Sequence, residues 1–136
     1  MKKYCFFSSR EFTRLLSKDE IQQVKTNLQT LDYLDEWKVR LSIIRAAFGG
    51  PVFINSWYRD EEHNKRVGGN PTSQHLDGSA VDIDSRDNAR LFATIKQLQR
   101  EGMDFGQIIT YGSGQYRFLH LSLPTRNKIN EYLQYP

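Results

Sequence analysis

Two histidines and one aspartate are the side chains of this chain best suited to metal chemistry. His75 and Asp82 lie seven positions apart in the run Ser-Gln-His-Leu-Asp-Gly-Ser-Ala-Val-Asp-Ile-Asp, and His120 lies in a later apolar run. Asp82 has apolar neighbours, where an unpaired carboxylate is costly, so we expect it to have a cationic partner. Two imidazoles and a carboxylate leave zinc an open fourth position for water. The pattern therefore suggests a catalytic zinc site.

The same spacing also fits a purely structural interpretation. In that interpretation His75 caps a turn, Asp82 accepts backbone hydrogen bonds and His120 packs in the core, because buried polar groups are usually hydrogen-bonded. Spacing and composition alone leave both interpretations open.

The composition is that of an ordinary globular protein. The 136 residues suit one domain spanning 1–136, with 38% hydrophobic and 26% charged residues. We expect no membrane span, and the apolar stretch at the start is too short for a signal peptide, so cytoplasmic synthesis is expected. The net charge of +3 comes from scattered basic residues, which argues against a nucleic-acid partner. A single cysteine, Cys5, excludes an internal disulfide framework, and we expect a monomer.

Apolar periodicity and turn residues predict an α+β fold. Helices are expected from Ser8 or Ser9, from Asp19 to about residue 31, and over residues 34–48, 61–67, 88–100 and 127–133. Strands are expected over residues 51–55, 80–83, 105–111 and 116–123. The last two strands read as a hairpin, which would hold His120 on a rigid sheet. We predict a small, mostly antiparallel sheet flanked by N-terminal and crossing helices.

An ordered series of motifs carries a family resemblance from about Phe7 to Tyr132. The motifs are Asn-Ser-Trp-Tyr-Arg at 55–59, Asn-Lys-Arg-Val-Gly-Gly at 64–69, the Ser-Gln-His and Ala-Val-Asp-Ile runs around the first two candidate ligands, and Phe-Leu-His-Leu-Ser at 118–122. The sequence resembles the zinc D-Ala-D-Ala carboxypeptidases and related peptidoglycan peptidases, whose fold is shared with the Hedgehog signalling domain. It is similar to the short, single-domain members from phages, prophages and bacteria, and this likeness raises delivery to the cell wall by a phage or prophage as an expectation.

The resemblance implies that His75, Asp82 and His120 ligate Zn²⁺, which would polarise the scissile carbonyl and lower the pKa of a water molecule. It also implies that Arg59 stabilises the oxyanion or grips the carboxylate of the peptide, because its guanidinium fork suits either task. The alternative for Arg59 is a surface salt bridge with one of the acids that follow it.

Ser73 and Gln74 match the residues that precede the first metal ligand in the family, and the resemblance implies that they bind substrate. Ser73 could equally stabilise the turn. The implied function is a zinc-dependent peptidase acting on peptidoglycan stem peptides. The alternative is a non-catalytic zinc-containing domain that binds cell wall or protein.

The sequence departs from the family where an acidic general base is expected. Gly106 replaces the family's Asp, Tyr111 stands where a Glu would be, and no acid lies between Phe105 and His120. A general base typically contributes about 10²–10⁴-fold to rate. Three explanations stay open, namely an acid borrowed from elsewhere in the chain, zinc hydroxide acting without a base, or a binding module. The candidate acids are Asp77, Asp84 and Asp104.

Overall fold

The computed structural model describes residues 6–136, so Cys5 lies outside the described part of the chain. Within that part, five strands form one sheet in the order β1-β2-β4-β3-β5. The strands are β1 (Phe53–Ser56), β2 (Ala80–Asp84), β3 (Gln107–Tyr111), β4 (Phe118–Ser122) and β5 (Glu131–Tyr135). The helices are α1 (Ser9–Thr13), α2 (Lys18–Lys25), α3 (Leu28–Phe48), α4 (Glu61–Arg66), the short 3₁₀ helix η2 (Gln74–Leu76) and α5 (Asn88–Arg100).

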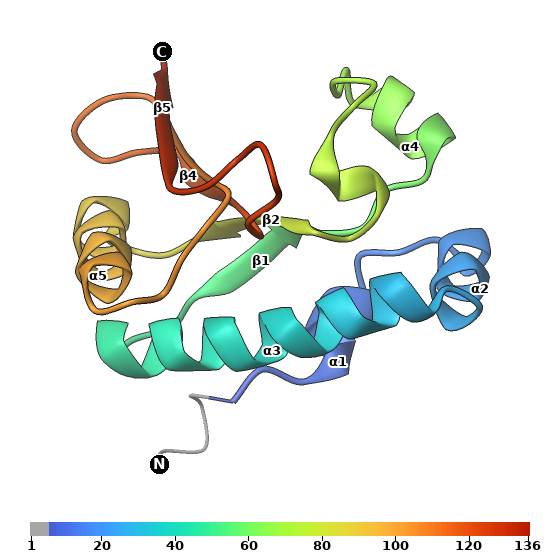
Figure 1. The fold of residues 1–136 in the computed structure, drawn as a ribbon, viewed down its shortest axis with the longest axis horizontal. Helices are drawn as coiled ribbons and strands as arrows, with labels where there is room; N and C mark the ends of the chain where they lie inside the picture. The colour runs from blue at the N-terminus through green and yellow to red at the C-terminus, as the bar shows by residue number, and fades with distance from the viewer. Residues whose placement is uncertain (1–5) are drawn as a thin grey trace.

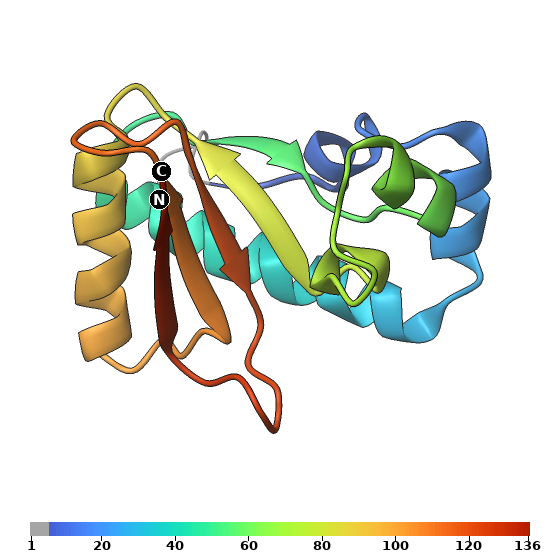
Figure 2. The same cartoon turned by 90° about the horizontal axis from the view of Figure 1, so that it is seen from above.

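The sheet is antiparallel except at one edge. β1 with β2, β2 with β4, and β4 with β3 all pair antiparallel, whereas β5 pairs parallel with β3. Figure 1 shows α3 along one side of this sheet and α4 on the other. Figure 2 shows that α3 spans the molecule between α5 at one end and α2 at the other. The predicted α+β fold, with a mostly antiparallel sheet and a β3–β4 hairpin, is therefore confirmed.

The helix predicted from Asp19 to residue 31 is in fact two helices, so that prediction was wrong in its boundary. α2 ends at Lys25, and Asn27 begins the next helix by accepting a hydrogen bond from the Thr30 N–H at 3.1 Å. Asn at this position satisfies a backbone donor that the helix itself cannot satisfy. The apolar periodicity runs through the break because α2 and the start of α3 pack against each other.

The final helical turns predicted over residues 127–133 were also wrong, because the chain forms β5 there. Asn130 has a left-handed backbone (φ 54°), and its N–H donates to the Phe105 carbonyl, which turns the chain alongside β3. The Tyr132 ring then stacks on Phe92 of α5 at 5.2 Å. Whether a segment forms a strand depends on its tertiary neighbours, here the β3 strand and the α5 helix. These contacts override the local helical signal in the sequence.

The core lies between α3, α5 and the sheet. Its largest fully buried side chains include Trp37 and Leu41 of α3, Trp57 after β1, and Ile95 of α5. Burying an aliphatic side chain of this size contributes about 1.5–3 kcal/mol. α3 is the longest helix in the described residues, and neither it nor any other helix there carries an apolar stretch of membrane-crossing length.

Candidate metal centre

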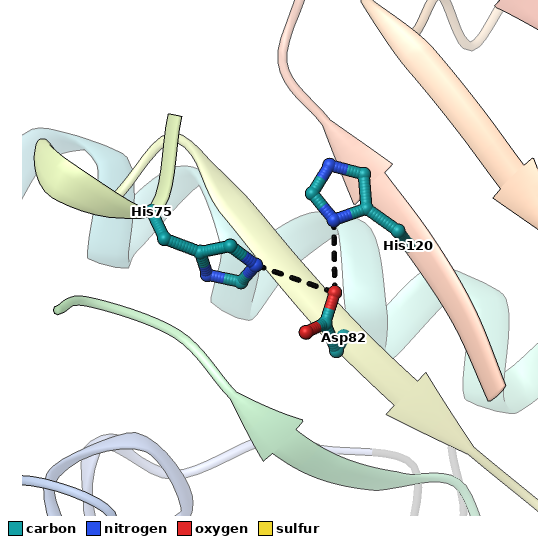
Figure 3. Close-up of side chains that lie close together, drawn as sticks. All are labelled: His75, Asp82 and His120. Atoms are coloured by element: carbon teal, nitrogen blue, oxygen red, sulfur yellow. Dashed lines mark hydrogen bonds and ion pairs between the residues drawn. The ribbon is translucent and has the colours of Figure 1, made fainter. Parts of the chain in front are cut away.

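The three predicted ligands converge on one point. Asp82 in β2 and His120 in β4 are direct cross-strand partners, and His75 reaches them from η2. The Asp82 Oδ1 lies 3.3 Å from the His75 Nε2 and 2.8 Å from the His120 Nδ1 (Figure 3). The three candidate ligand atoms all lie within 4.8 Å of one another, and no other group of this kind occurs among residues 6–136. The structure therefore assembles the predicted metal site.

The backbone around His75 sets its tautomer. Its Nδ1 contacts the Trp57 carbonyl oxygen, which can only accept a hydrogen bond, so Nδ1 carries the proton. Nε2 is then the nitrogen that faces the Asp82 carboxylate and that would offer its lone pair to a metal ion. The His75 N–H donates to the Ser73 Oγ (3.1 Å), and its carbonyl accepts from the Arg59 N–H (2.9 Å). His75 is thus fixed on both sides before any metal binds.

This donor set fits zinc. Ligand atoms about 2.0–2.1 Å from a tetrahedral zinc ion lie about 3.3 Å apart, which matches the separation of His75 and Asp82. Burial raises the pKa of Asp82, but hydrogen bonds and charge from His120 and His75 outweigh it and hold the pKa well below its usual range. The carboxylate is therefore ionised at neutral pH, as metal coordination requires.

The turn between His75 and Asp82 is anchored on α3. Trp37 and Trp57 both donate their indole N–H to the Gly78 carbonyl, and Thr30 donates its hydroxyl to the Asp77 carbonyl at 2.9 Å. Gly78 has φ +86°, and a Cβ atom there would press on Thr30 and Trp57. Only glycine suits this backbone at this close approach. The α3 helix thereby fixes where the first ligand lies relative to the second.

Arg59 lies beside the three candidate ligands and contacts one of them, Asp82, directly. Its Nη2 is 3.4 Å from the Asp82 Oδ2, its Nε donates to the Ser56 Oγ at 3.1 Å, and its Nη1 donates to the Asn64 Oδ1 at 3.4 Å. Its recorded ion pair in the described chain is thus with Asp82, not with the acids at 60–62. The sequence pattern did not reveal Ser56 or Asn64 as partners, although both lie inside the quoted motifs.

The two candidate substrate-binding residues both line the cavity around the ligands. Ser73 also begins η2, where its hydroxyl accepts the His75 N–H, so it does stabilise the turn. The Gln74 amide donates to the Ser79 Oγ (3.1 Å) and to the Leu123 carbonyl (3.2 Å). Gln74 therefore ties η2 to the end of β4 beside His120. Their contact with substrate stays a prediction.

The cavity has a volume of about 520 Å³. One wall comes from the segment after α4, which includes Gly68, Asn70 and Thr72, and the floor comes from the strands. The sequence did not identify Tyr111, Lys128 and Tyr135 as cavity residues, but all three line it. The register offers a signal for Tyr111 alone, because alternate residues of a strand face the same side and Ile109 pairs with His120.

None of the three candidate general bases lines this cavity. Asp77 accepts hydrogen bonds from the N–H and hydroxyl of Ser79 in the anchored turn. Asp84 accepts from the Asn88 amide at the start of α5. Asp104 is exposed and accepts from the Asn130 amide. Asp82 is the single carboxylate among the residues that line the cavity.

The two family positions that have lost their acids differ structurally. A Cβ atom at Gly106 would collide with the Leu123 carbonyl oxygen. The backbone therefore leaves no room for an acidic side chain at this position. Tyr111 keeps its place at the cavity, but burial and the charge of Asp82 raise the pKa of its hydroxyl, with a smaller lowering by Arg59. The hydroxyl is therefore protonated at neutral pH and can donate a hydrogen bond, but it cannot act as a base.

Comparisons with known proteins agree with this geometry. A family model described as Peptidase M15 matches residues 9–122, a range that includes all three candidate ligands and Arg59. Peptidases of this family are zinc-dependent. No curated protein matches the chain.

Proposed function

Because this chain belongs to the peptidase M15 family, we propose that it is a zinc-dependent peptidase that hydrolyses peptide bonds of peptidoglycan stem peptides, in the manner of D-Ala-D-Ala carboxypeptidases. The observation that carries the proposal is the convergence of His75, Asp82 and His120 at the floor of a cavity large enough for a peptide. Three protein ligands leave the fourth position of a tetrahedral zinc site open.

Each candidate ligand has one atom available for the metal ion, and neighbouring groups hold His75 and Asp82 in place. His75 would bind through Nε2 while its Nδ1–H donates to the Trp57 carbonyl, and His120 would bind through Nδ1. The Asp82 carboxylate would be the third ligand, and Arg59 contacts its Oδ2. A bound zinc ion supplies Lewis acidity, which polarises a carbonyl group and makes a water molecule acidic.

Two hydrogen-bond donors stabilise the negative charge that develops on the substrate. The Arg59 guanidinium is fixed by its protein partners beside the ligands, and the protonated Tyr111 hydroxyl lies in the same cavity. Donors held in place before the reaction stabilise an oxyanion without reorganisation, and losing one typically costs about 10²–10³ in kcat. In the absence of a second carboxylate, we propose that the enzyme works without a separate general base and is therefore slow.

One observation favours a second candidate function, a zinc-containing domain that binds wall peptide without cleaving it. The cavity contains the metal ligands and the donors but no acid free to take a proton. A binding module needs the metal ligands and the hydrogen-bond donors, but it does not need an acid that takes a proton.

Turnover separates the two functions. Zinc-loaded protein is incubated with a stem pentapeptide that ends in D-Ala-D-Ala and with intact peptidoglycan, and the products are identified by mass spectrometry. The peptidase proposal expects cleavage that disappears in zinc-free protein and in His120→Ala. Absence of any product over long incubation, with the peptide still bound, would establish the binding module instead.

A further inference from the structure

The far wall of the metal cavity is built by residues that follow the family match. The match ends at residue 122, and Lys128, Leu133 and Tyr135 then add their side chains to the cavity lining. β5 carries two of these residues, and the connection between β4 and β5 carries the third. β5 forms the edge of the sheet next to β3. This wall is thus formed by residues of the segment that follows the matched range.

The strand register links this wall to the metal. His120 pairs with Ile109, and Ile109 pairs with Leu133, so one row crosses three strands from a ligand to the edge of the sheet. Neighbouring strands lie about 4.8 Å apart, so Leu133 lies roughly 10 Å from His120 along the row. That distance accommodates one amino-acid residue on one side of the scissile bond.

A second row lies beside the first and is aromatic. Phe118 pairs with Tyr111, and Tyr111 pairs with Tyr135. The Phe118 and Tyr111 rings stack with centroids 4.4 Å apart, and Tyr135 lies 5.7 Å from Tyr111. These ring contacts give this row an aromatic surface, which suits a small apolar side chain better than a charged one.

The cations of the cavity are not equally available to a ligand. Arg59 already uses its Nε and both Nη atoms on Ser56, Asn64 and Asp82. Lys128 is half-buried, and its ammonium has no hydrogen bond or ion pair with any residue of the described chain. Its backbone is nevertheless held, because Lys128 and Thr125 exchange two hydrogen bonds. The cavity also lacks a carboxylate to neutralise this ammonium, apart from the metal ligand.

We propose that Lys128, Leu133 and Tyr135 form a subsite for the C-terminal residue of the peptide substrate, with the Lys128 ammonium binding its free carboxylate. This inference rests on the proposed function for the identity of the ligand as a stem peptide. It assigns carboxylate recognition to Lys128 and leaves Arg59 to hold Asp82 and to stabilise the oxyanion. It also makes the protein select peptide ends over internal bonds.

The test compares two ligands that differ only at the end. Acetyl-L-Lys-D-Ala-D-Ala with a free carboxylate and the same peptide as its C-terminal amide are titrated against the full chain by calorimetry, in zinc-loaded and zinc-free protein. The wild type is expected to bind the acid about tenfold more tightly than the amide, the order of a charge-assisted hydrogen bond. Because zinc itself attracts carboxylates, the preference must persist in zinc-free protein.

Variants then locate the preference. Lys128→Met keeps the apolar stem and is expected to abolish the preference with amide binding unchanged, whereas Lys128→Arg keeps it. Leu133→Ala is expected to weaken binding of acid and amide equally. The matched control is Lys65→Met, which removes an exposed lysine of α4 that does not line this cavity. All variants are checked for zinc content and for an unchanged unfolding midpoint.

The outcomes distinguish this inference from the proposed function. A Lys128-dependent preference without cleavage upholds the subsite and refutes the peptidase. Cleavage with equal binding of acid and amide, or with a preference that survives Lys128→Met, refutes the subsite and leaves the peptidase standing. If the peptide neither binds nor is cleaved, both are wrong.

Discussion

Trp37 and Trp57 donate their indole N–H groups to one and the same oxygen, the carbonyl of Gly78, at 3.1 and 2.7 Å. A carbonyl oxygen has two lone pairs, so both bonds are satisfied together. The Trp57 backbone carbonyl also accepts a hydrogen bond from the Nδ1–H of His75. The long helix α3 is thereby connected through a single turn to the geometry of the first metal ligand.

Replacing Trp37 by Phe tests this connection. The variant removes one of the two indole donors and leaves Trp57 in place, so we expect a loss of about 0.5–1.5 kcal/mol from the hydrogen bond, with further loss from the smaller ring. Urea unfolding with and without zinc measures it. If the turn positions His75, zinc affinity falls as well. An unchanged zinc affinity would mean that the turn is held without α3.

The metal ligands are tested against a histidine outside the site. His120→Ala is expected to reduce bound zinc from about one ion per chain to a small fraction, because two protein ligands hold zinc poorly. His63→Ala is the matched control, since His63 pairs with Glu20 at 2.9 Å and contacts no ligand. Elemental analysis after dialysis gives both values. Equal zinc content in the two variants would contradict the assignment.

Arg59→Lys tests whether a fork is required beside Asp82. Lys cannot bind Ser56, Asn64 and the carboxylate together, so we expect turnover to fall and zinc affinity to drop about tenfold, the low end for a group that supports a ligand. Arg66→Lys on the exposed side of α4 is the control. A fall in turnover with zinc affinity intact would show that Arg59 acts on the substrate and not through Asp82.

The sequence predicted the three converging candidate ligands better than it predicted the walls around them. His75, Asp82 and His120 could be found because their residue types are rare and their strands are strongly apolar. Lys128 and Tyr135 could not, because their places depend on β5 pairing with β3, which no local pattern encodes. The end of α2 was missed for a similar reason, since apolar spacing continues across the Asn27 cap. The partners of Arg59 depend on tertiary contacts alone.

Glu20 gives a prediction for stability against pH. Burial raises its pKa, but hydrogen bonds from the Ser17 N–H, His63 and the Asp60 N–H outweigh this and hold the pKa below its ordinary value. A lowered folded-state pKa stabilises the protein above the unfolded pKa, and this stability is lost as pH falls through the folded pKa. Urea unfolding between about pH 3 and pH 7 should show a steeper fall of stability towards acid pH in the wild type than in Glu20→Gln.

The control for that comparison is Glu101→Gln, which changes an exposed acid after α5. It should keep the acid decline of the wild type. Parallel pH profiles for the wild type and Glu20→Gln would show that the Glu20 network contributes nothing that depends on its charge.

Substitution of the three acids outside the cavity tests whether any of them acts as the general base. Asp77, Asp84 and Asp104 are all bound to neighbours away from the cavity lining, so Asn in place of each is expected to leave turnover within about twofold, far from the 10²-fold or more that a general base supplies. Tyr111→Phe removes only the hydroxyl of a residue that lines the cavity and is expected to lower kcat by about tenfold or more with zinc retained. Steady-state kinetics on a stem peptide measures all four variants. A hundredfold loss in one Asp variant with zinc retained would identify a borrowed base and show that the loops move when substrate binds, because the structure places every one of these carboxylates outside the cavity.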